Sequence, residues 1–179
     1  MEEVRTLGEV NTEALRAAVL AVSETWWYDD QYRQQGTQVA KASQSIRLTG
    51  REGLWWTRFE AVVAPMLADL QTRWYPTDAT LGKIVFSRLL PHTKIALHTD
   101  HEPDQATLHR VHVPLCSNDA AILSFTDAYQ RQWRQFHLRP GLAYEIRSEL
   151  PHLAFNKGST SRIHLVCDFH YVVEPALVS

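Results

Sequence analysis

Four histidines, three acidic residues and an arginine fall within one short segment, "KIALHTDHEPDQATLHRVHVPL" (94–115). In an extended chain, side chains two residues apart point to the same side, so His98 and Asp100 are placed to bind one ion while Thr99 points away. Non-haem Fe(II) oxygenases hold their metal with two histidines and one carboxylate on one face of an octahedron. The H-x-D pair therefore predicts part of a metal site that needs a further histidine from elsewhere in the chain.

A candidate for this third ligand lies in "ELPHLAFNKGSTSRIHLVCDF" (149–169). His152 begins a predicted strand, and Arg162 begins the next one, ten residues later and after the "NKGSTS" turn. We expect a hairpin here, which would return Arg162 close to His152 but deeper along the sheet. A guanidinium in that place could grip the distal carboxylate of a dicarboxylate whose other end is on the metal, which predicts 2-oxoglutarate.

Simpler interpretations exist for the same residues. An H-x-D pair is common by chance, Arg162 alone could be a surface charge, and the polar residues after Asp100 are typical of a solvated turn, in which we also place His101 and His109. Histidines in strands are more often structural than ligating, which applies to His112, His137, His164 and His170. The ordered combination of H-x-D, a distant histidine and an arginine within one β-rich region favours the metal site.

The first 80 residues are predicted to be mostly helical. The spacing of apolar residues predicts one helix over 11–27 and a second over 54–75, with a short strand within 38–50. The second helix places one apolar stripe on a single face and contains Pro65, where a kink is expected; the stripe consists of Phe59, Val62, Val63, Met66 and Leu70. The four tryptophans at 26, 27, 55 and 56 are expected in the core rather than in a pocket wall.

From residue 81 to residue 173 the pattern changes to short β-branched and aromatic segments separated by turn residues. The predicted strands are 83–90, 110–116, 120–126, 132–138, 142–147, 152–156 and 162–173. Strands at this spacing favour a β-sandwich or barrel, with the helices covering one face. We therefore predict a single domain over 1–179, mainly β with N-terminal helices, in which 1–80 support a β core at 81–173.

The composition is that of a globular protein, with 45% hydrophobic residues, 21% charged residues and six tryptophans in 179 residues. The net charge of -2, without a basic block, argues against a nucleic-acid partner. The acidic first residues lack the pattern of a signal peptide and no apolar window is long enough to cross a membrane, so a cytoplasmic protein is expected. Cys116 and Cys167 lie in apolar strand-like runs and are expected to be free thiols.

The segment from Lys83 to Phe169 resembles the aspartyl/asparaginyl β-hydroxylase family of Fe(II)- and 2-oxoglutarate-dependent dioxygenases, and within it the cis-4-proline hydroxylase type. In this family a serine precedes the first iron histidine by eleven residues, as Ser87 precedes His98 in "FSRLLPHTKIALH". The family's R-x-H strand is matched by "RVH" at 110–112, and its distal histidine and arginine are matched by His152 and Arg162.

The resemblance implies a double-stranded β-helix, a cupin-like jelly roll, and it implies a role for each matched residue. His98 and His152 would bind iron together with Asp100, a carboxylate that the proline-hydroxylase type keeps and that animal protein-modifying members replace with glycine. Arg162 and Ser87 would hold the distal carboxylate of 2-oxoglutarate. The implied roles of His112 and Arg110 are contacts with the cosubstrate or the substrate, with Arg110 orienting a substrate carboxylate.

The implied reaction consumes Fe(II)-bound 2-oxoglutarate and O₂, releases succinate and CO₂, and hydroxylates an sp3 carbon of a small-molecule substrate, a free amino acid or an amino-acid residue of a peptide. One alternative is hydroxylation of Asp or Asn on a protein client. Another is a cupin-like module that binds a metal or a small ligand without redox chemistry. Arg162 together with Ser87 favours the oxygenase, because a plain metal binder would need neither. The oligomeric state and a lid over 101–109 are left open.

Overall fold

The structure, a computed structural model, describes residues 2–28, 43–49, 54–100, 107–127 and 131–171. The helices are α1 (Glu13–Leu20), α2 (Glu24–Tyr28) and α5 (Leu54–Trp74). The strands are β1 (Val4–Glu9), β2 (Ser43–Arg47), β3 (Thr80–Leu89), β4 (Thr93–His98), β5 (Leu108–Cys116), β6 (Ala121–Thr126), β7 (Trp133–Phe136), β8 (Leu142–Ile146), β9 (His152–Asn156) and β10 (Arg162–His170).

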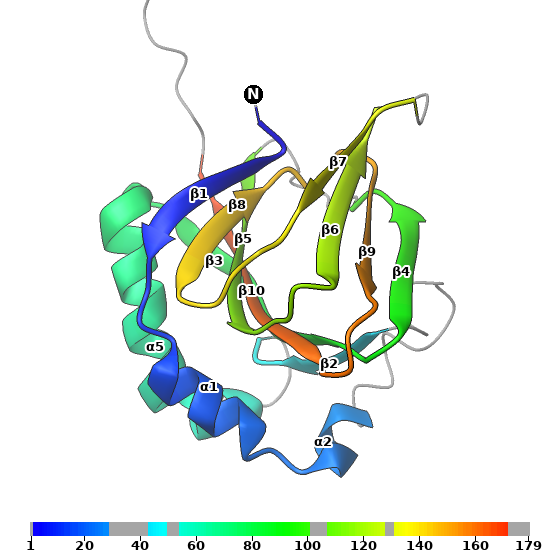
Figure 1. Cartoon of the computed structure of the whole chain (residues 1–179). Helices are drawn as coiled ribbons and strands as arrows, with labels where there is room; N and C mark the ends of the chain where they lie inside the picture. The colour runs from blue at the N-terminus through cyan, green and yellow to red at the C-terminus, as the bar shows by residue number, and fades with distance from the viewer. Residues whose placement is uncertain (1, 29–42, 50–53, 101–106, 128–130, 172–179) are drawn as a thin grey trace, which may run out of the picture.

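The strands form two antiparallel sheets that face each other (Figure 1). The large sheet has six strands in the order β1-β8-β5-β10-β3-β2, and the small sheet has four in the order β4-β9-β6-β7. Consecutive strands repeatedly switch between the sheets, as in a jelly roll. This arrangement confirms the predicted β core with N-terminal helices.

Strand β10 shows how one sequence serves both faces of the large sheet. Alternate residues of a strand point to opposite faces. Ile163, Leu165, Cys167 and Phe169 belong to the core that packs under the helices, whereas Arg162 and Val166 line a pocket between the two sheets. His164 and Asp168 share the alternation of Arg162 and Val166, so a row of buried polar side chains faces the interior of the jelly roll.

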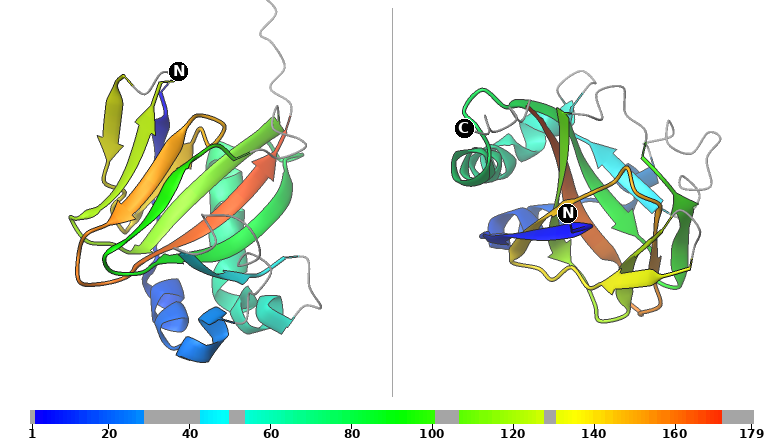
Figure 2. Two further views of the ribbon diagram at one scale, coloured as in Figure 1. Left: turned by 90° about the vertical axis from the view of Figure 1, so that its right-hand side faces the viewer. Right: turned by 90° about the horizontal axis from the view of Figure 1, so that it is seen from above.

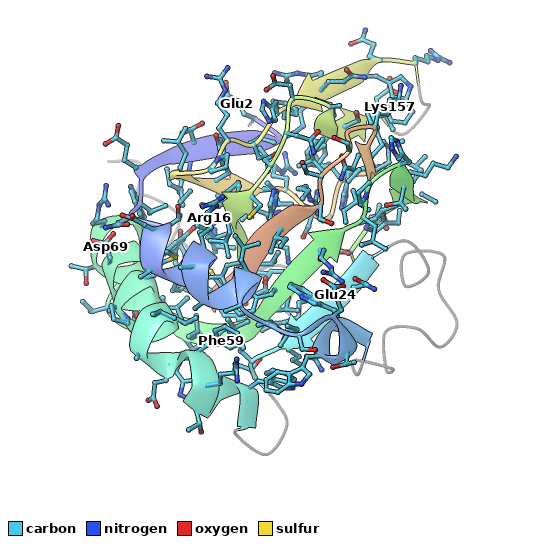
Figure 3. The ribbon with its side chains drawn as sticks, turned by 60° about the horizontal axis from the view of Figure 1, so that its bottom comes forward. Glu2, Arg16, Glu24, Phe59, Asp69 and Lys157 are labelled. Carbon is cyan, nitrogen blue, oxygen red and sulfur yellow. The ribbon has the colours of Figure 1, made fainter. Side chains whose placement is uncertain are left out.

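Helices α1 and α5 cover the outer face of the large sheet (Figures 1 and 2). The buried side of α5 carries Phe59, Val63, Met66, Leu67 and Leu70, which matches the predicted stripe except that Val62 is only partly buried and Leu67, which was not predicted, is buried. Phe59, labelled in Figure 3, contacts Phe86 of β3 edge-on at a ring-centroid distance of 4.8 Å. All four tryptophans at 26, 27, 55 and 56 belong to or pack against this core, as expected.

The N-terminal region differs from the prediction in two ways. The single helix expected over 11–27 is two helices, because the chain turns at 21–23 and Ser23, a residue type that favours helix N-termini, precedes α2. Strand β1 was not expected, and it pairs with β8 at the edge of the large sheet. The short strand expected within 38–50 is β2, at 43–47; residues 38–42 and 50 lie outside the described residues.

The hairpin expected between His152 and Arg162 is wrong. Strand β9 pairs with β4 and β6 in the small sheet, whereas β10 pairs with β3 and β5 in the large sheet. The connection, which begins at Lys157 (labelled in Figure 3), crosses from one sheet to the other. The side-chain amide of Asn156 holds it there by donating to the backbone carbonyls of Leu89, Leu90 and Thr160.

His109 is a further correction, because it lies in β5 and not in a solvated turn. Its ring stacks on Tyr171 at a centroid distance of 4.1 Å and its Nδ1 lies 2.8 Å from Glu145 Oε1. His101 and most of the segment considered as a lid fall at 101–106, outside the described residues, as do 172–173 at the end of the last predicted strand. Cys116 and Cys167 are free thiols, the first partly buried and the second fully buried.

Among the helices in the described ranges, none combines the length and the apolar character that a membrane crossing needs.

Candidate metal centre

His98 and His152 are brought together by the pairing of β4 with β9. His98 ends β4, His152 begins β9, and the two residues are direct partners across the strands. Their ring centroids are 4.2 Å apart. Asp100 follows β4 and is anchored through its backbone N–H, which donates to the Ser148 carbonyl at 2.9 Å. One nitrogen of each histidine and one oxygen of Asp100 lie within 4.8 Å of one another.

Hydrogen bonds to backbone carbonyls fix the tautomers of both histidines. The Nδ1 of His98 lies 2.8 Å from the Ala96 oxygen, and the Nδ1 of His152 lies 2.8 Å from the Leu150 oxygen. A carbonyl oxygen can only accept, so each Nδ1 carries the hydrogen and each Nε2 presents a lone pair. Burial lowers the pKa of His152, which keeps this ring neutral at neutral pH.

This donor set suits ferrous iron. Two imidazoles and one carboxylate converge, with His98 Nε2 3.6 Å from Asp100 Oδ1, and their second hydrogen-bonding positions are held by the protein. The three residues predicted as ligands are therefore adjacent, although they come from two strands of the small sheet and the segment after one of them.

Arg162 lies on the opposite wall, at the start of β10 in the large sheet. It is 5% exposed, and its Nε has no hydrogen-bond partner among the described residues. In the part of the chain that the structure describes, no carboxylate pairs with it. Burial lowers its pKa to about 10, so the group remains charged at neutral pH. An uncompensated buried charge is costly, which indicates a place prepared for an anion.

Two further predicted residues accompany Arg162 in the large sheet. Ser87 of β3 is buried and lines the same pocket. His112 of β5 lines it too, and its Nδ1 lies 3.2 Å from Nδ1 of His164, so one ring donates and the other accepts. Burial, reinforced by the positive charge of Arg162, lowers the pKa of both rings well below the usual value. Both histidines are therefore neutral, and His164 orients His112.

Arg110 lines the pocket, but its guanidinium already has two carboxylate partners within the protein. Its Nε and Nη2 each donate to Asp168 at 2.8 Å, and its Nη1 donates to Oδ2 of Asp100. The prediction that Arg110 contacts the cosubstrate or a substrate carboxylate thus stays a prediction. Sequence reasoning missed Asp168 and gave His164 only a structural role, although both share the two-residue alternation of Arg162 along an otherwise apolar strand.

The remaining lining of the pocket is mostly apolar. Val85, Ile95, Leu123, Ile146, Ala154 and Val166 surround the polar groups, together with Ser43 and Lys83. The metal-ligating candidates and the buried guanidinium thus open into one space. A ligand there would be enclosed by aliphatic walls, which keep water from the reacting atoms.

A family model described as "Aspartyl/Asparaginyl beta-hydroxylase" matches residues 9–171, which include every residue of the site. The chain belongs to this family. Membership confirms the predicted hydroxylase that depends on Fe(II), 2-oxoglutarate and O₂, and the converging His98, Asp100 and His152 fit the iron that the family requires. No curated protein is similar enough in sequence to the hydroxylase to count as a match.

Solved structures share the fold of the hydroxylase at low sequence identity. An oxidoreductase of the 2OG-Fe(II) oxygenase family from Burkholderia pseudomallei has a TM-score of 0.56 at 14% identity, over 72% of this chain and 67% of that one. A prolyl-4-hydroxylase from Pseudomonas putida has a TM-score of 0.56 at 12% identity, over 97% and 95%. The viral collagen prolyl hydroxylase of Paramecium Bursaria Chlorella virus-1, solved with 2OG, has a TM-score of 0.52 at 10% identity, over 96% and 97%.

Proposed function

We propose that the hydroxylase binds Fe(II) through His98, Asp100 and His152, binds the distal carboxylate of 2-oxoglutarate through Arg162 and Ser87, and hydroxylates an sp3 carbon of an amino acid. The observation that carries this proposal is the buried guanidinium of Arg162, whose Nε has no hydrogen-bond partner among the described residues, in the same pocket as the three candidate ligands. A carboxylate is the ligand that a guanidinium fork recognises best.

The two sheets that form the walls of the pocket have different roles in this proposal. When bound, iron and 2-oxoglutarate supply the oxidising chemistry that puts one oxygen atom of O₂ into a C–H bond while 2-oxoglutarate becomes succinate and CO₂. The protein holds the ligands in place: the small sheet presents the two Nε2 lone pairs, and the large sheet presents the cation and the neutral His112. The aliphatic lining keeps water away while the substrate carbon is held in position.

The alternative, a cupin-like metal binder without redox chemistry, is tested by spectroscopy. Fe(II) and 2-oxoglutarate added without oxygen are expected to give a weak visible charge-transfer band. Replacing Arg162 or His152 with alanine is expected to abolish the band at the same ligand concentrations. Arg134→Ala is the matched control, because this arginine pairs with Glu3 on the surface and the band should survive. A wild-type protein that gives no band supports the plain binder.

For the substrate, we propose a free amino acid or an amino-acid residue of a peptide, with proline and prolyl peptides first in the test. The fold is shared with proteins named as prolyl hydroxylases, one of them acting on collagen by its name. Lys83 also lines the pocket, where its Nζ lies 3.8 Å from Oδ2 of Asp168.

The family description favours a second candidate, hydroxylation of Asp or Asn in a protein or peptide client. Both candidates are tested together by incubating the hydroxylase with Fe(II), 2-oxoglutarate and ascorbate. Free amino acids and peptides containing Pro, Asp or Asn are then scored by the gain of one oxygen atom and by succinate release. Product from free amino acids or prolyl peptides supports the first candidate, and product confined to Asp or Asn peptides supports the second. Succinate that never exceeds the His98→Ala background contradicts both.

A further inference from the structure

Asp168 is a buried carboxylate next to the candidate metal site. It is 2% exposed and lies on β10, directly across from Arg110 on β5. Both oxygens of Asp168 accept hydrogen bonds from Arg110, from Nε and from Nη2, at 2.8 Å each. Such a two-pronged pair fixes the plane of the guanidinium as well as its position.

The third nitrogen of Arg110 reaches the metal ligand. Its Nη1 donates to Oδ2 of Asp100, while the other oxygen, Oδ1, is the one that lies 3.6 Å from Nε2 of His98. Asp100 follows the end of β4, where strand pairing does not hold its side chain. Arg110 therefore holds one carboxylate oxygen of Asp100 and leaves the other facing the histidines.

We propose that Asp168 is a positioning residue for the metal ligand Asp100 and acts through Arg110. The inference rests on the proposed function, since it takes Asp100 as a ligand. Asp168 fixes Arg110 so that Nη1 points at Oδ2, and this leaves Oδ1 directed toward the ion. Asp168 also balances the charge of Arg110, which would otherwise repel a divalent cation and compete with it for Asp100.

A buried ion pair of this kind can also exist only for stability, so the test must measure metal binding apart from folding. Mn(II) serves as the probe, because its free form is quantified by electron paramagnetic resonance without any turnover. For Asp168→Asn, which keeps the shape and removes the charge, we expect Mn(II) affinity to fall by about 10- to 100-fold. We expect Asp168→Glu, which restores the charge, to recover part of that loss.

The matched control is Glu145→Gln, the same chemical change on the outer face of the neighbouring strand β8. Glu145 accepts hydrogen bonds from Arg5 and Tyr75 and contacts His109, away from the metal site. We expect this variant to lower the melting temperature and to leave Mn(II) affinity unchanged. If Asp168→Asn, correctly folded, binds Mn(II) as tightly as the wild type, the inference is overturned.

A pair of variants covers the case in which Asp168→Asn alone does not fold. Arg110→Gln leaves Asp168 with Lys83, whose Nζ lies 3.8 Å from Oδ2, as its remaining cation among the described residues. The double variant Arg110→Gln/Asp168→Asn removes both charges of the buried pair, so the two variants are compared once each is shown to be folded. If Asp168 acts through Arg110, the two variants bind Mn(II) equally weakly. A double variant that binds much more weakly than Arg110→Gln refutes the inference. Failure of the proposed function is a separate result, because the wild type would then not bind Mn(II) at these residues at all.

Discussion

His98 and His152 are cross-strand partners, and each ring donates its Nδ1 hydrogen to the backbone carbonyl two residues earlier in the chain. The repeated arrangement aims two Nε2 lone pairs into one space. Because the backbone of the small sheet makes both hydrogen bonds, the candidate metal site is preformed by the fold.

Replacing either histidine should therefore remove the metal without unfolding the protein. We expect His98→Gln and His152→Gln to weaken Mn(II) binding at least about 100-fold, since a bare imidazole nitrogen is lost from a three-ligand site. The measurement is Mn(II) titration together with far-ultraviolet circular dichroism. His137→Gln is the control, because this histidine contacts Ser117 away from the pocket and should bind Mn(II) as the wild type does. Tight binding by both ligand variants would place the metal elsewhere.

Arg162 should stabilise the complex with 2-oxoglutarate and lower the free energy of unfolding of the ligand-free protein. We expect Arg162→Met to raise the free energy of unfolding without ligands, on the order of 1–4 kcal/mol, because it removes a buried charge that pairs with no carboxylate among the described residues. The same variant should lose the stabilisation by 2-oxoglutarate, about 2.7 kcal/mol for the wild type at a hundredfold excess over the dissociation constant. Urea unfolding of the ligand-free protein measures the first effect, and urea unfolding in Mn(II), with and without 2-oxoglutarate, measures the second. An equal shift with 2-oxoglutarate in wild type and variant contradicts the assignment of Arg162.

The neutral pair His112 and His164 should make stability depend on pH. Their pKa values are lowered well below 6.5 in the folded protein, so on unfolding both rings take up protons that the folded state excludes. Stability therefore falls as the pH drops below about 6.5, by about 1.4 kcal/mol per pH unit for each ring, and is fully present above that pH. The buried ligand His152 shifts in the same direction.

The check is urea unfolding of the metal-free protein between about pH 7.5 and pH 5.5. Glu24 and Glu145 have lowered pKa values and lose their stabilising charge only below their usual value of 4.5, so they stay outside this window. His164→Gln should remove a share of the slope that corresponds to one proton. A stability that is flat, or that rises as the pH falls, would contradict neutral burial of the pair.

Gly158 should be intolerant of a side chain, since it lies in the connection that crosses between the sheets. A Cβ there would lie 2.2 Å from Oδ1 of Asn118, whose amide donates to Asn156 Oδ1 and to the Thr160 carbonyl. We expect Gly158→Ala to reduce the free energy of unfolding by about 1–3 kcal/mol, because Asn118 must move away from both partners. Urea unfolding measures the loss. Ser159→Ala, at an exposed neighbour, should change stability by less than about 0.5 kcal/mol.

Much of the fold and of the candidate site was accessible from sequence because the underlying patterns are local. The two-residue period of the strands, the apolar stripe of α5 and the spacing of H-x-D from Arg110 are all short-range features. His98 and Asp100 do lie close together, with His98 Nε2 3.6 Å from Asp100 Oδ1, although β4 ends at His98 and Asp100 follows it. The family membership extends this agreement to the cofactors.

What sequence could not provide is the choice of partner strand. The turn after Asn156 resembles that of a hairpin, but the strands it joins belong to different sheets: β9 pairs with β4 and β6, and β10 pairs with β3 and β5. The same long-range pairing places Asp168 against Arg110, so an acid within the apolar run "RIHLVCDFH" becomes part of the site. The sequence around Arg110 does not indicate that its guanidinium already binds two carboxylates, those of Asp100 and Asp168.

Because the connection from β9 to β10 crosses between the sheets, the residues of the candidate site are divided between the two sheets. The candidate iron ligands belong to the small sheet and the segment after it, whereas Arg162, Ser87 and His112 belong to the large sheet. A dicarboxylate bound by both walls would link the two sheets through their side chains, and succinate, itself a dicarboxylate, would keep this link until it leaves the pocket.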